Sequence, residues 1–252
     1  MEVCQQSEAF VEEHGDLEFS HTKLILREGN QYYYAITSHR YSDDTSKIDP
    51  HELDLVPIPA SQIWPSFPTQ FGRAPEPLPQ DCFVKRPSLL DCGDNEASNG
   101  HVGSLLLHEA EVCEILRASP HPNIAQYLGC LVENDKIMGL CFVKYGMNLK
   151  EMVRKDSRPF DADLILQGIQ EGIRHLHSLG LIHCDINPAN IVMDGDTPVI
   201  VDFDSCQRNG EKLGIKGGTP DWTRDDFEFA RPENDEYGLS KIRDFLLGVH
   251  KM

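Results

Sequence analysis

The chain has 252 residues, enough for one large domain or two modest ones with a substantial hydrophobic core. It carries 23 Lys and Arg against 41 Asp and Glu, a formal net charge of −18 at pH 7. This acidity argues against nucleic acid or an anionic membrane as the partner. It favours a protein substrate or a protein partner, a basic one included.

The sequence shows no targeting signal, membrane-spanning run or cysteine pattern that would indicate a compartment other than a reducing one. The first twenty residues contain six acidic side chains and no Lys or Arg, unlike a secretory or mitochondrial signal. No apolar run approaches the roughly 18 residues of a membrane-spanning helix. The eight cysteines form no Cys-x-x-Cys pair, so neither a zinc site nor a disulfide framework is indicated. We therefore expect a cytoplasmic or nuclear location; nothing in the sequence predicts an oligomeric state.

Residues 1–80 read as an N-terminal extension with two features. The stretch from His21 to Ser38 predicts a β-hairpin around a turn at Glu28-Gly29-Asn30. Residues 56–80 contain seven prolines, which cannot enter a sheet interior. This stretch predicts an extended segment covering a lobe; a linker or a ligand for a proline-binding module is the alternative. The covering role is favoured by interleaved apolar residues: Ile63, Trp64, Phe67 and Phe71.

Residues 81–252 mix short apolar strands with helical patterns. Three strands are predicted between residues 81 and 145: Cys82–Lys85, Cys130–Val132 and Leu140–Val143. A helix is predicted through Leu105 to Leu116, before the turn at His121-Pro122. Between residues 146 and 252, one face of a buried helix is indicated by apolar residues at i, i+4, i+8 and i+11, namely Ile165, Ile169, Ile173 and Leu176.

The most informative stretch runs from Leu176 to Val192. It contains His183-Cys184-Asp185, with Asn190 five residues after the Asp, on a loop between a helix and an apolar strand. A second apolar run then leads into Asp202-Phe203-Asp204. Phosphoryl transfer from ATP requires a carboxylate that accepts a proton, and an amide and a second carboxylate that hold a divalent metal.

These motifs resemble those of the protein kinase superfamily. His183-Cys184-Asp185 stands in place of His-Arg-Asp, and Asp202-Phe203-Asp204 in place of Asp-Phe-Gly. The resemblance covers about residues 82–245. It implies a bilobal α+β fold, with a small antiparallel β lobe at 81–145 and a mainly helical large lobe at 146–252. Asp235–Leu239 resembles the start of the central helix, so we expect a large lobe truncated after that helix.

The resemblance implies a site for ATP and Mg²⁺. Asp185 would accept the proton of the substrate hydroxyl, with Asn187 and Asn190 as neighbouring catalytic residues. Asn190 and Asp202 would hold the metal through their oxygen atoms. Lys85 would contact the α- and β-phosphates of the nucleotide.

Lys85 is also expected to form an ion pair with a Glu of the predicted helix. Glu111 precedes His121-Pro122 by the interval usual in the family, and Glu109 and Glu114 are its rivals. All three would otherwise be surface residues of that helix. The remaining residues expected around the nucleotide are Phe83, Val143, Tyr145 and Val192.

The chain departs from the family pattern at several positions. No Gly-x-Gly-x-x-Gly precedes Lys85. Phe83 stands where kinases place Ala against adenine, and on a strand it shares a face with Lys85. Its ring is therefore expected to fill the cleft or shift the base, unless local twist places it in the core of the small lobe. Asn187 replaces a Lys that contacts the γ-phosphate, and Asp204 replaces the Gly.

Three functions from different classes are consistent with these residues. We favour phosphoryl transfer to a protein Ser or Thr hydroxyl, because the chain retains Lys85, Asp185, Asn190 and Asp202. Gly217–Pro220 also resembles the segment that supports the substrate hydroxyl. The departures favour a pseudokinase, a binding module with weak or no ATP binding. Asp202-Phe203-Asp204 also suits a small-molecule phosphotransferase of the aminoglycoside or choline kinase type, although His121–Ile124 and Leu176–Gly180 are more similar to protein kinases.

Overall fold

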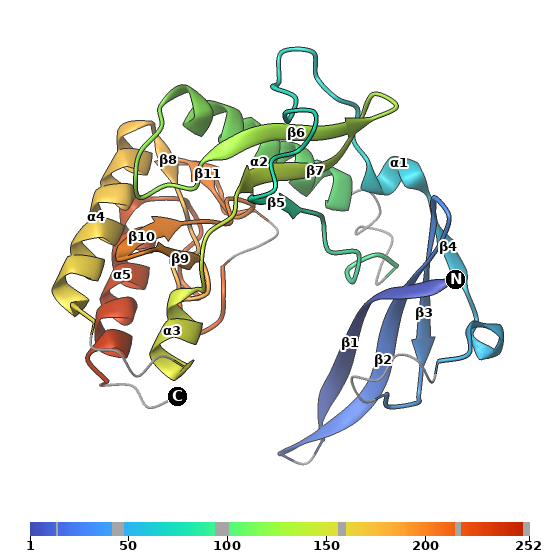
Figure 1. Cartoon of the computed structure of the whole chain (residues 1–252). Helices are drawn as coiled ribbons and strands as arrows, with labels where there is room; N and C mark the ends of the chain where they lie inside the picture. The colour runs from blue at the N-terminus through green and yellow to red at the C-terminus, as the bar shows by residue number, and fades with distance from the viewer. Residues whose placement is uncertain (14, 42–47, 94–100, 156–159, 215–217, 249–252) are drawn as a thin grey trace. The chain divides into compact units, whose positions relative to one another are not determined.

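The computed structural model describes residues 1–13, 15–41, 48–93, 101–155, 160–214 and 218–248 (Figure 1). The chain forms two compact units. One comprises residues 1–67, 86–107 and 133–139, and the other comprises residues 68–85, 108–132 and 140–252. These units do not follow the expected boundaries after residues 80 and 145. The reason is that the proline-rich stretch divides, and each part pairs within a different unit.

The first unit contains a four-stranded antiparallel sheet in the order β1-β2-β3-β4. Its strands are β1 (Glu2–Glu13), β2 (Asp16–Glu28), β3 (Gln31–Thr37) and β4 (Val56–Ile58). The predicted hairpin is confirmed, because Glu28 pairs with Gln31 across the turn at Gly29-Asn30. A core cluster is formed by Leu24, Leu26, Ala35 and Ile48. The short helices η2 (Pro50–Glu52) and α1 (Ala60–Ile63) flank β4 in the chain.

The proline-rich segment pairs with neighbouring backbone instead of hanging free. In the first unit, the N–H of Phe67 donates to the carbonyl of Asp135 at 2.9 Å. In the second unit, Cys130 donates to Gly72 and Ala74 donates back to Cys130, each at 2.8 Å. These hydrogen bonds attach the segment to the tip of the β6–β7 hairpin in the first unit and to β6 in the second.

The second unit contains a three-stranded sheet in the order β5-β7-β6. The strands are β5 (Cys82–Lys85), β6 (Tyr127–Glu133) and β7 (Lys136–Val143), and the tip of the β6–β7 hairpin belongs to the first unit. All three strands were predicted. Phe83 pairs with Phe142 and Lys85 with Leu140 in the antiparallel β5–β7 ladder. Among the described residues, no strand pairs with the outer edge of β5.

Helices and short strands make up the rest of the second unit. Helix α2 (His101–Ala118) contributes its later turns, and α3 (Leu149–Lys155), α4 (Ala162–Ser178) and α5 (Pro232–Leu246) follow. Strand β9 (Ile191–Asp194) pairs with β10 (Thr197–Ile200), and β8 (Leu181–Ile182) with β11 (Gln207–Arg208). Helices α4 and α5 lie side by side (Figure 1). This α+β arrangement, with a small antiparallel sheet and a helical part, agrees with the expected fold class.

Helix α4 is held tightly against β10, which fixes the loop that follows the helix. Its predicted apolar face is buried at Ile165, Ile169, Ile173 and Leu176. A Cβ at Gly172 would lie 2.9 Å from the backbone carbonyl oxygen of Asn123 and 2.8 Å from the Cδ1 atom of Ile200, so this position requires glycine. The side chain of Asp161 caps the helix by accepting a hydrogen bond from the N–H of Leu164 at 3.0 Å.

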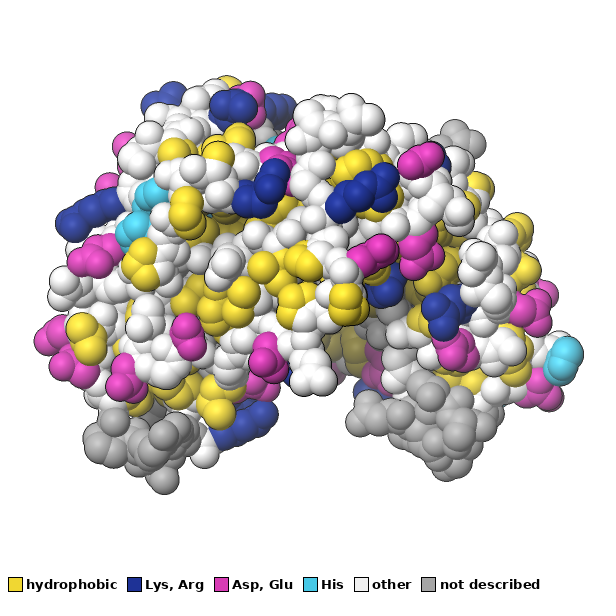
Figure 2. Space-filling view, turned by 45° about the horizontal axis from the view of Figure 1, so that its top comes forward, with side chains coloured by type: hydrophobic (Ala, Val, Ile, Leu, Met, Phe, Trp, Pro, Cys, Tyr) yellow, Lys and Arg dark blue, Asp and Glu magenta, His cyan; other side chains and the backbone are white. Residues whose placement is uncertain are grey.

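On the face drawn in Figure 2, Asp and Glu side chains are interspersed with Lys and Arg side chains. Within the described part of the chain, none of the helices is long and apolar enough to span a bilayer.

Candidate active site

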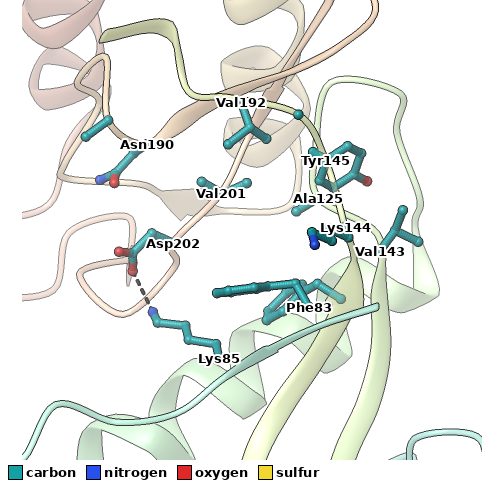
Figure 3. A pocket seen from close by; sticks show the side chains of 13 residues that line it. Phe83, Lys85, Ala125, Val143, Lys144, Tyr145, Asn190, Val192, Val201 and Asp202 are labelled. Carbon is teal, nitrogen blue, oxygen red and sulfur yellow. Dashed lines mark hydrogen bonds and ion pairs between the residues drawn. The ribbon is translucent and has the colours of Figure 1, made fainter. Parts of the chain in front are cut away.

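A cavity of about 410 Å³ lies beside the sheet of the second unit. This volume falls within the range of small-molecule sites in proteins. Seven residues that the sequence assigned to the nucleotide or the metal line it: Phe83, Lys85, Val143, Tyr145, Asn190, Val192 and Asp202. Figure 3 shows Phe83 on one side of the cavity, with Val192 and Val201 on the other. The cavity therefore combines two apolar walls with a polar end at Lys85 and Asp202.

Phe83 faces the cavity and not the core of the sheet. Phe83 is 52% exposed, so its ring is not buried in the core of the small lobe, which was the alternative expected from local twist. Phe83 and Lys85 share a face of β5, as the alternation of a strand requires. The ring does not fill the cleft, because the 410 Å³ remain open beside it.

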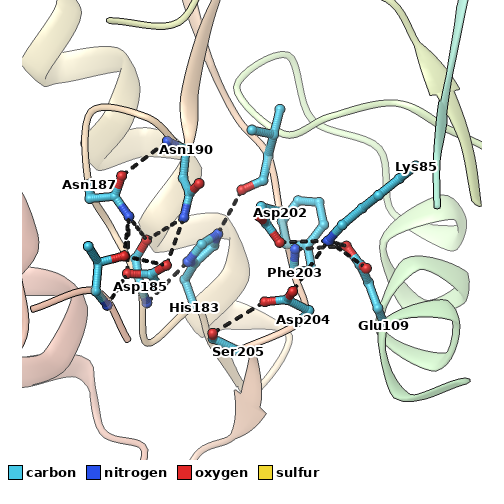
Figure 4. A network of polar contacts seen from close by, with 12 residues as sticks. Lys85, Glu109, His183, Asp185, Asn187, Asn190, Asp202, Phe203, Asp204 and Ser205 are labelled. Carbon is cyan, nitrogen blue, oxygen red and sulfur yellow. Dashed lines mark hydrogen bonds and ion pairs between the residues drawn. The ribbon is translucent and has the colours of Figure 1, made fainter. Parts of the chain in front are cut away.

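Lys85 is surrounded by three carboxylates at the polar end of the cavity. Its Nζ atom lies 2.7 Å from Glu109, 2.6 Å from Asp202 and 3.6 Å from Asp204 (Figure 4). Burial acts to lower the pKa of Lys85, but the three carboxylates outweigh it and raise that pKa above its usual range. Lys85 is therefore a fixed positive charge within a cluster that carries a formal surplus of negative charge.

Glu109, and not Glu111, is the helix partner of Lys85. Glu109 is 2% exposed and also accepts a hydrogen bond from the N–H of Phe203 at 3.1 Å, whereas Glu111 is exposed. Side chains two positions apart point about 200° away from each other around a helix, so only one of Glu109 and Glu111 can face Lys85. The expectation for Glu111 was wrong because the interval to His121-Pro122 does not define the helical face. Burial raises the pKa of the Glu109 carboxyl, and Lys85 opposes that shift.

The pair Glu109→Gln and Glu111→Gln tests this assignment. Glu109→Gln is expected to lower the free energy of unfolding by about 1–3 kcal/mol, since it weakens two buried hydrogen bonds to a charged group. Glu111→Gln, at an exposed position of the same helix, should change it by less than about 0.5 kcal/mol. Urea unfolding of both variants measures the difference, and equal losses would contradict the assignment.

Asp185 lies at the centre of a second polar network (Figure 4). Its carboxylate accepts hydrogen bonds from the amides of Asn187 and Asn190, both at 3.0 Å. It also accepts from the N–H of Thr219 at 2.8 Å and from its hydroxyl at 3.1 Å. Four donors therefore fix the orientation of this carboxylate. Thr219 belongs to the predicted Gly217–Pro220 segment, of which Gly217 lies outside the described residues.

His183 connects the Asp185 loop to the strand end that carries Asp202. Its Nδ1 atom accepts a hydrogen bond from the N–H of Asp185 at 3.3 Å, so Nε2 carries the proton and donates to the carbonyl of Val201 at 3.1 Å. The ring packs edge-on against Phe203, which is fully buried. This packing couples the two loops that hold the candidate catalytic and metal-binding residues.

Asp235, on helix α5, anchors the loop that carries Asp185. Its buried carboxylate accepts hydrogen bonds from the N–H groups of His183 at 3.0 Å and Cys184 at 2.9 Å, and contacts the His177 ring nitrogen at 2.8 Å. Cys184 has a φ of 65° and Asp202 a φ of 67°, a region that non-glycine residues seldom adopt. A non-glycine residue keeps such a conformation only where surrounding contacts hold its backbone. At Cys184 the hydrogen bond from its N–H to the Asp235 carboxylate does this.

A family model of the protein kinase domain matches residues 95–224, slightly more than half of the chain. The chain belongs to the protein kinase family. It is 30% identical over half its length to mitogen-activated protein kinase kinase kinase 3 of Arabidopsis thaliana, and 30% identical over 53% to the serine/threonine-protein kinase Tao of Drosophila melanogaster. It is 27% identical over 54% to sperm motility kinase 3A of Mus musculus. It covers 20%, 13% and 27% of these three relatives, respectively.

Sequence reasoning missed three contacts of this kinase domain. Two of them join residues that are far apart in the chain: the ion pair between Lys85 and Asp204, and the hydrogen bonds that the Asp185 loop donates to Asp235. The hydrogen bonds from Thr219 to Asp185 join residues that are 34 positions apart. A usable signal existed for Asp235, since it lies in the first turn of α5, in the stretch that resembles the start of the central helix, and a carboxylate buried there requires partners. No comparable signal existed for Asp204.

Proposed function

We propose that this kinase domain binds ATP with Mg²⁺ and transfers the γ-phosphoryl group to a Ser or Thr hydroxyl of a protein. The observation that carries the proposal is the grouping of Lys85, Asn190 and Asp202 around one cavity, with Asp185 bonded directly to Asn190. Kinase relatives whose names specify serine and threonine support the class of acceptor. The acidic chain favours a basic protein substrate.

The residues at the polar end of the cavity suit Mg²⁺, which prefers oxygen ligands. The amide nitrogen of Asn190 donates to Asp185, which leaves its Oδ1 atom as the available ligand. Asp202, with Glu109 and Asp204, forms a group of carboxylate oxygens within 4.8 Å of one another. Asn190 and Asp202 would hold the ion, with Asp204 close by. When bound, the metal neutralises charge on the β- and γ-phosphates.

Residues of the chain would also bind the phosphates and accept the proton of the acceptor hydroxyl. Lys85, held by Glu109, presents its ammonium group to the phosphates. Asp185 orients the acceptor hydroxyl and takes its proton, and the bonds from Asn187, Asn190 and Thr219 fix the direction of its carboxylate. Positioning of this kind supplies much of the rate enhancement in phosphoryl transfer.

Titration of ATP with and without Mg²⁺ tests the proposal. We expect Mg²⁺ to be required for tight binding, and Asp202→Ala to lose that requirement together with most of the affinity. Asp196→Ala, which removes an exposed carboxylate in the β9–β10 turn, is the matched control and should bind like the parent. Calorimetry or thermal shift measures both, since ligand at 100 times its dissociation constant stabilises by about 2.7 kcal/mol. Equal affinity with Mg²⁺ and with chelator would count against the proposal.

A pseudokinase is the second candidate, and one observation favours it. Lys85 forms ion pairs with three carboxylates, so a phosphate must compete with Asp202 and Asp204 for its ammonium group. A protein of this kind would bind partners without transferring phosphate. Absence of phosphorylation of basic Ser/Thr peptides, despite measured Mg²⁺-dependent ATP binding, would favour this second candidate.

A further inference from the structure

The first unit contains a hairpin that extends beyond the other strands of its sheet. Strand β2 pairs with β3 over Thr22–Glu28, whereas in the described part of the chain residues 16–21 of β2 pair only with β1. Residues 9–13 and 16–21, which we call the hairpin end, therefore form a ribbon of two strands (Figure 1). A two-stranded ribbon is only marginally stable in water, and pairing with a third strand stabilises it.

Strand β1 is an edge strand of 12 residues, which is long for an uncovered edge. Among the residues that the structure describes, neither another strand nor a loop backbone bonds to its outer side. Its pairing with β2 is regular over Gln5–Ala9 and again over Phe10–Glu13, with a register shift between these stretches. Every second residue of a regular edge directs its N–H and C=O groups outward. The outer side of β1 therefore offers backbone donors and acceptors to an extended segment.

The two faces of the hairpin end differ in character. Phe10 pairs with Phe19, and Leu17 lies two residues before Phe19, so these three side chains share one face. Asp16 and Glu18 alternate with Leu17 and lie on the other face. Leu17 is 75% exposed and Phe10 44% exposed, and both carboxylates are exposed. One face is therefore mainly apolar and the other mainly acidic, which matches a segment in which apolar and basic residues alternate.

Arg40 shows how a basic side chain fits the hairpin. Its guanidinium carbon lies 5.4 Å from the ring centre of Phe10 and 5.7 Å from that of Phe19. The same guanidinium forms an ion pair of 2.9 Å with Glu8. Aromatic rings and carboxylates both attract a guanidinium, and here one Arg meets both. The hairpin end itself contains four Asp and Glu residues and no Lys or Arg, so basic side chains that bind there must come from outside it.

We propose that the outer edge of β1 binds an extended basic segment of a partner protein, which joins the sheet as a fifth strand. Main-chain hydrogen bonds to β1 would hold the segment, and its Lys or Arg side chains would meet the acidic face of the hairpin end. A second copy of this chain is the wrong partner, because β1 contains four Glu and no Lys or Arg. Like charges opposite one another destabilise a strand pair.

A synthetic peptide of alternating Lys and Val, about ten residues long, is the probe, and its binding to the full chain is measured by fluorescence anisotropy. We expect a peptide with Glu in place of each Lys to bind at least about tenfold more weakly. A Lys-Val peptide with Pro-Pro at its centre should also bind at least about fivefold more weakly, because Pro lacks the N–H donor in either register. Equal binding of all three peptides, or no binding of the Lys-Val peptide, would overturn the proposal.

Hydrogen exchange locates the bound peptide on the parent protein. The peptide should slow exchange of the amides of residues 5–13, because those that face outward become bonded. Exchange in β4, at the other edge of the sheet, should not change. Binding that leaves exchange in residues 5–13 unchanged would show attraction by the acidic surface without strand addition, and would overturn the proposal.

Charge reversal at the hairpin end completes the test. The double variant Glu12→Lys with Glu18→Lys, at two exposed positions, should weaken the Lys-Val peptide by about 5- to 30-fold. Glu52→Lys with Asp54→Lys changes the net charge equally at exposed positions outside the hairpin and is the matched control. Circular dichroism checks that each variant is folded. Equal weakening in both double variants would show that only the net charge of the chain attracts the peptide.

This proposal does not depend on phosphoryl transfer. The probe contains no Ser, Thr or Tyr, so it cannot accept a phosphoryl group and its binding does not report on catalysis. If the chain binds no nucleotide, the proposed function fails while the peptide result stands. If nucleotide binds with Mg²⁺ but the peptide does not bind to β1, only this inference fails.

Discussion

Asp185→Asn is expected to lower phosphoryl transfer by about 10²–10⁴-fold, the usual contribution of a general base. The amide of Asn cannot accept a proton from the substrate hydroxyl. One of its two polar atoms also becomes a donor, which conflicts with the donors of Thr219 that now meet the carboxylate. ATP affinity should remain nearly unchanged, because Asp185 is not among the residues that line the cavity.

Phosphorylation of a basic Ser/Thr peptide and ATP binding by calorimetry measure these two effects separately. Asp194→Asn, an exposed position at the end of β9, is the control for loss of a carboxylate charge. Phosphorylation at the parental rate in Asp185→Asn would contradict the assigned base. Loss of ATP binding in parallel with the rate would indicate a damaged site and not a missing proton acceptor.

Asp235→Ala is expected to lower the free energy of unfolding by at least about 3 kcal/mol. The fully buried carboxylate accepts from two backbone N–H groups and contacts His177, so its removal leaves buried donors without a partner. The same change should release the loop that holds Asp185, because Cys184 would lose the bond that holds its left-handed conformation.

Urea unfolding measures the stability of this variant, with Glu236→Ala as the control on the same helix. Glu236 is exposed, and its removal should change the free energy of unfolding by less than about 0.5 kcal/mol. Asp235→Asn keeps one acceptor oxygen and should show an intermediate loss. A loss in Asp235→Ala no larger than in Glu236→Ala would show that the carboxylate does not anchor the loop.

The local features of this kinase domain could be predicted from its sequence. Asp185 and Asn190 lie five residues apart on one loop, and Phe83 and Lys85 lie two apart on one strand. Such spacings fix the relative positions of side chains wherever the element lies, because a strand alternates and a helix repeats every 3.6 residues. The family, the strands around Lys85 and the helix before Asp185 followed from these spacings.

The tertiary structure decided what depends on contacts between distant segments. It selected Glu109 over Glu111, since the choice depends on which face of α2 packs toward β5. It brought Lys85 into an ion pair with Asp204, which lies 204 − 85 = 119 positions later in the chain. It also left the ring of Phe83 exposed beside the open cavity, neither buried in the core nor filling the cleft. Strand alternation indicates the face of β5 that Phe83 shares with Lys85, but the choice of Glu109, the approach of Asp204 and the open space beside the Phe83 ring follow from the packing of whole elements, in which burial and charge pairing are settled together.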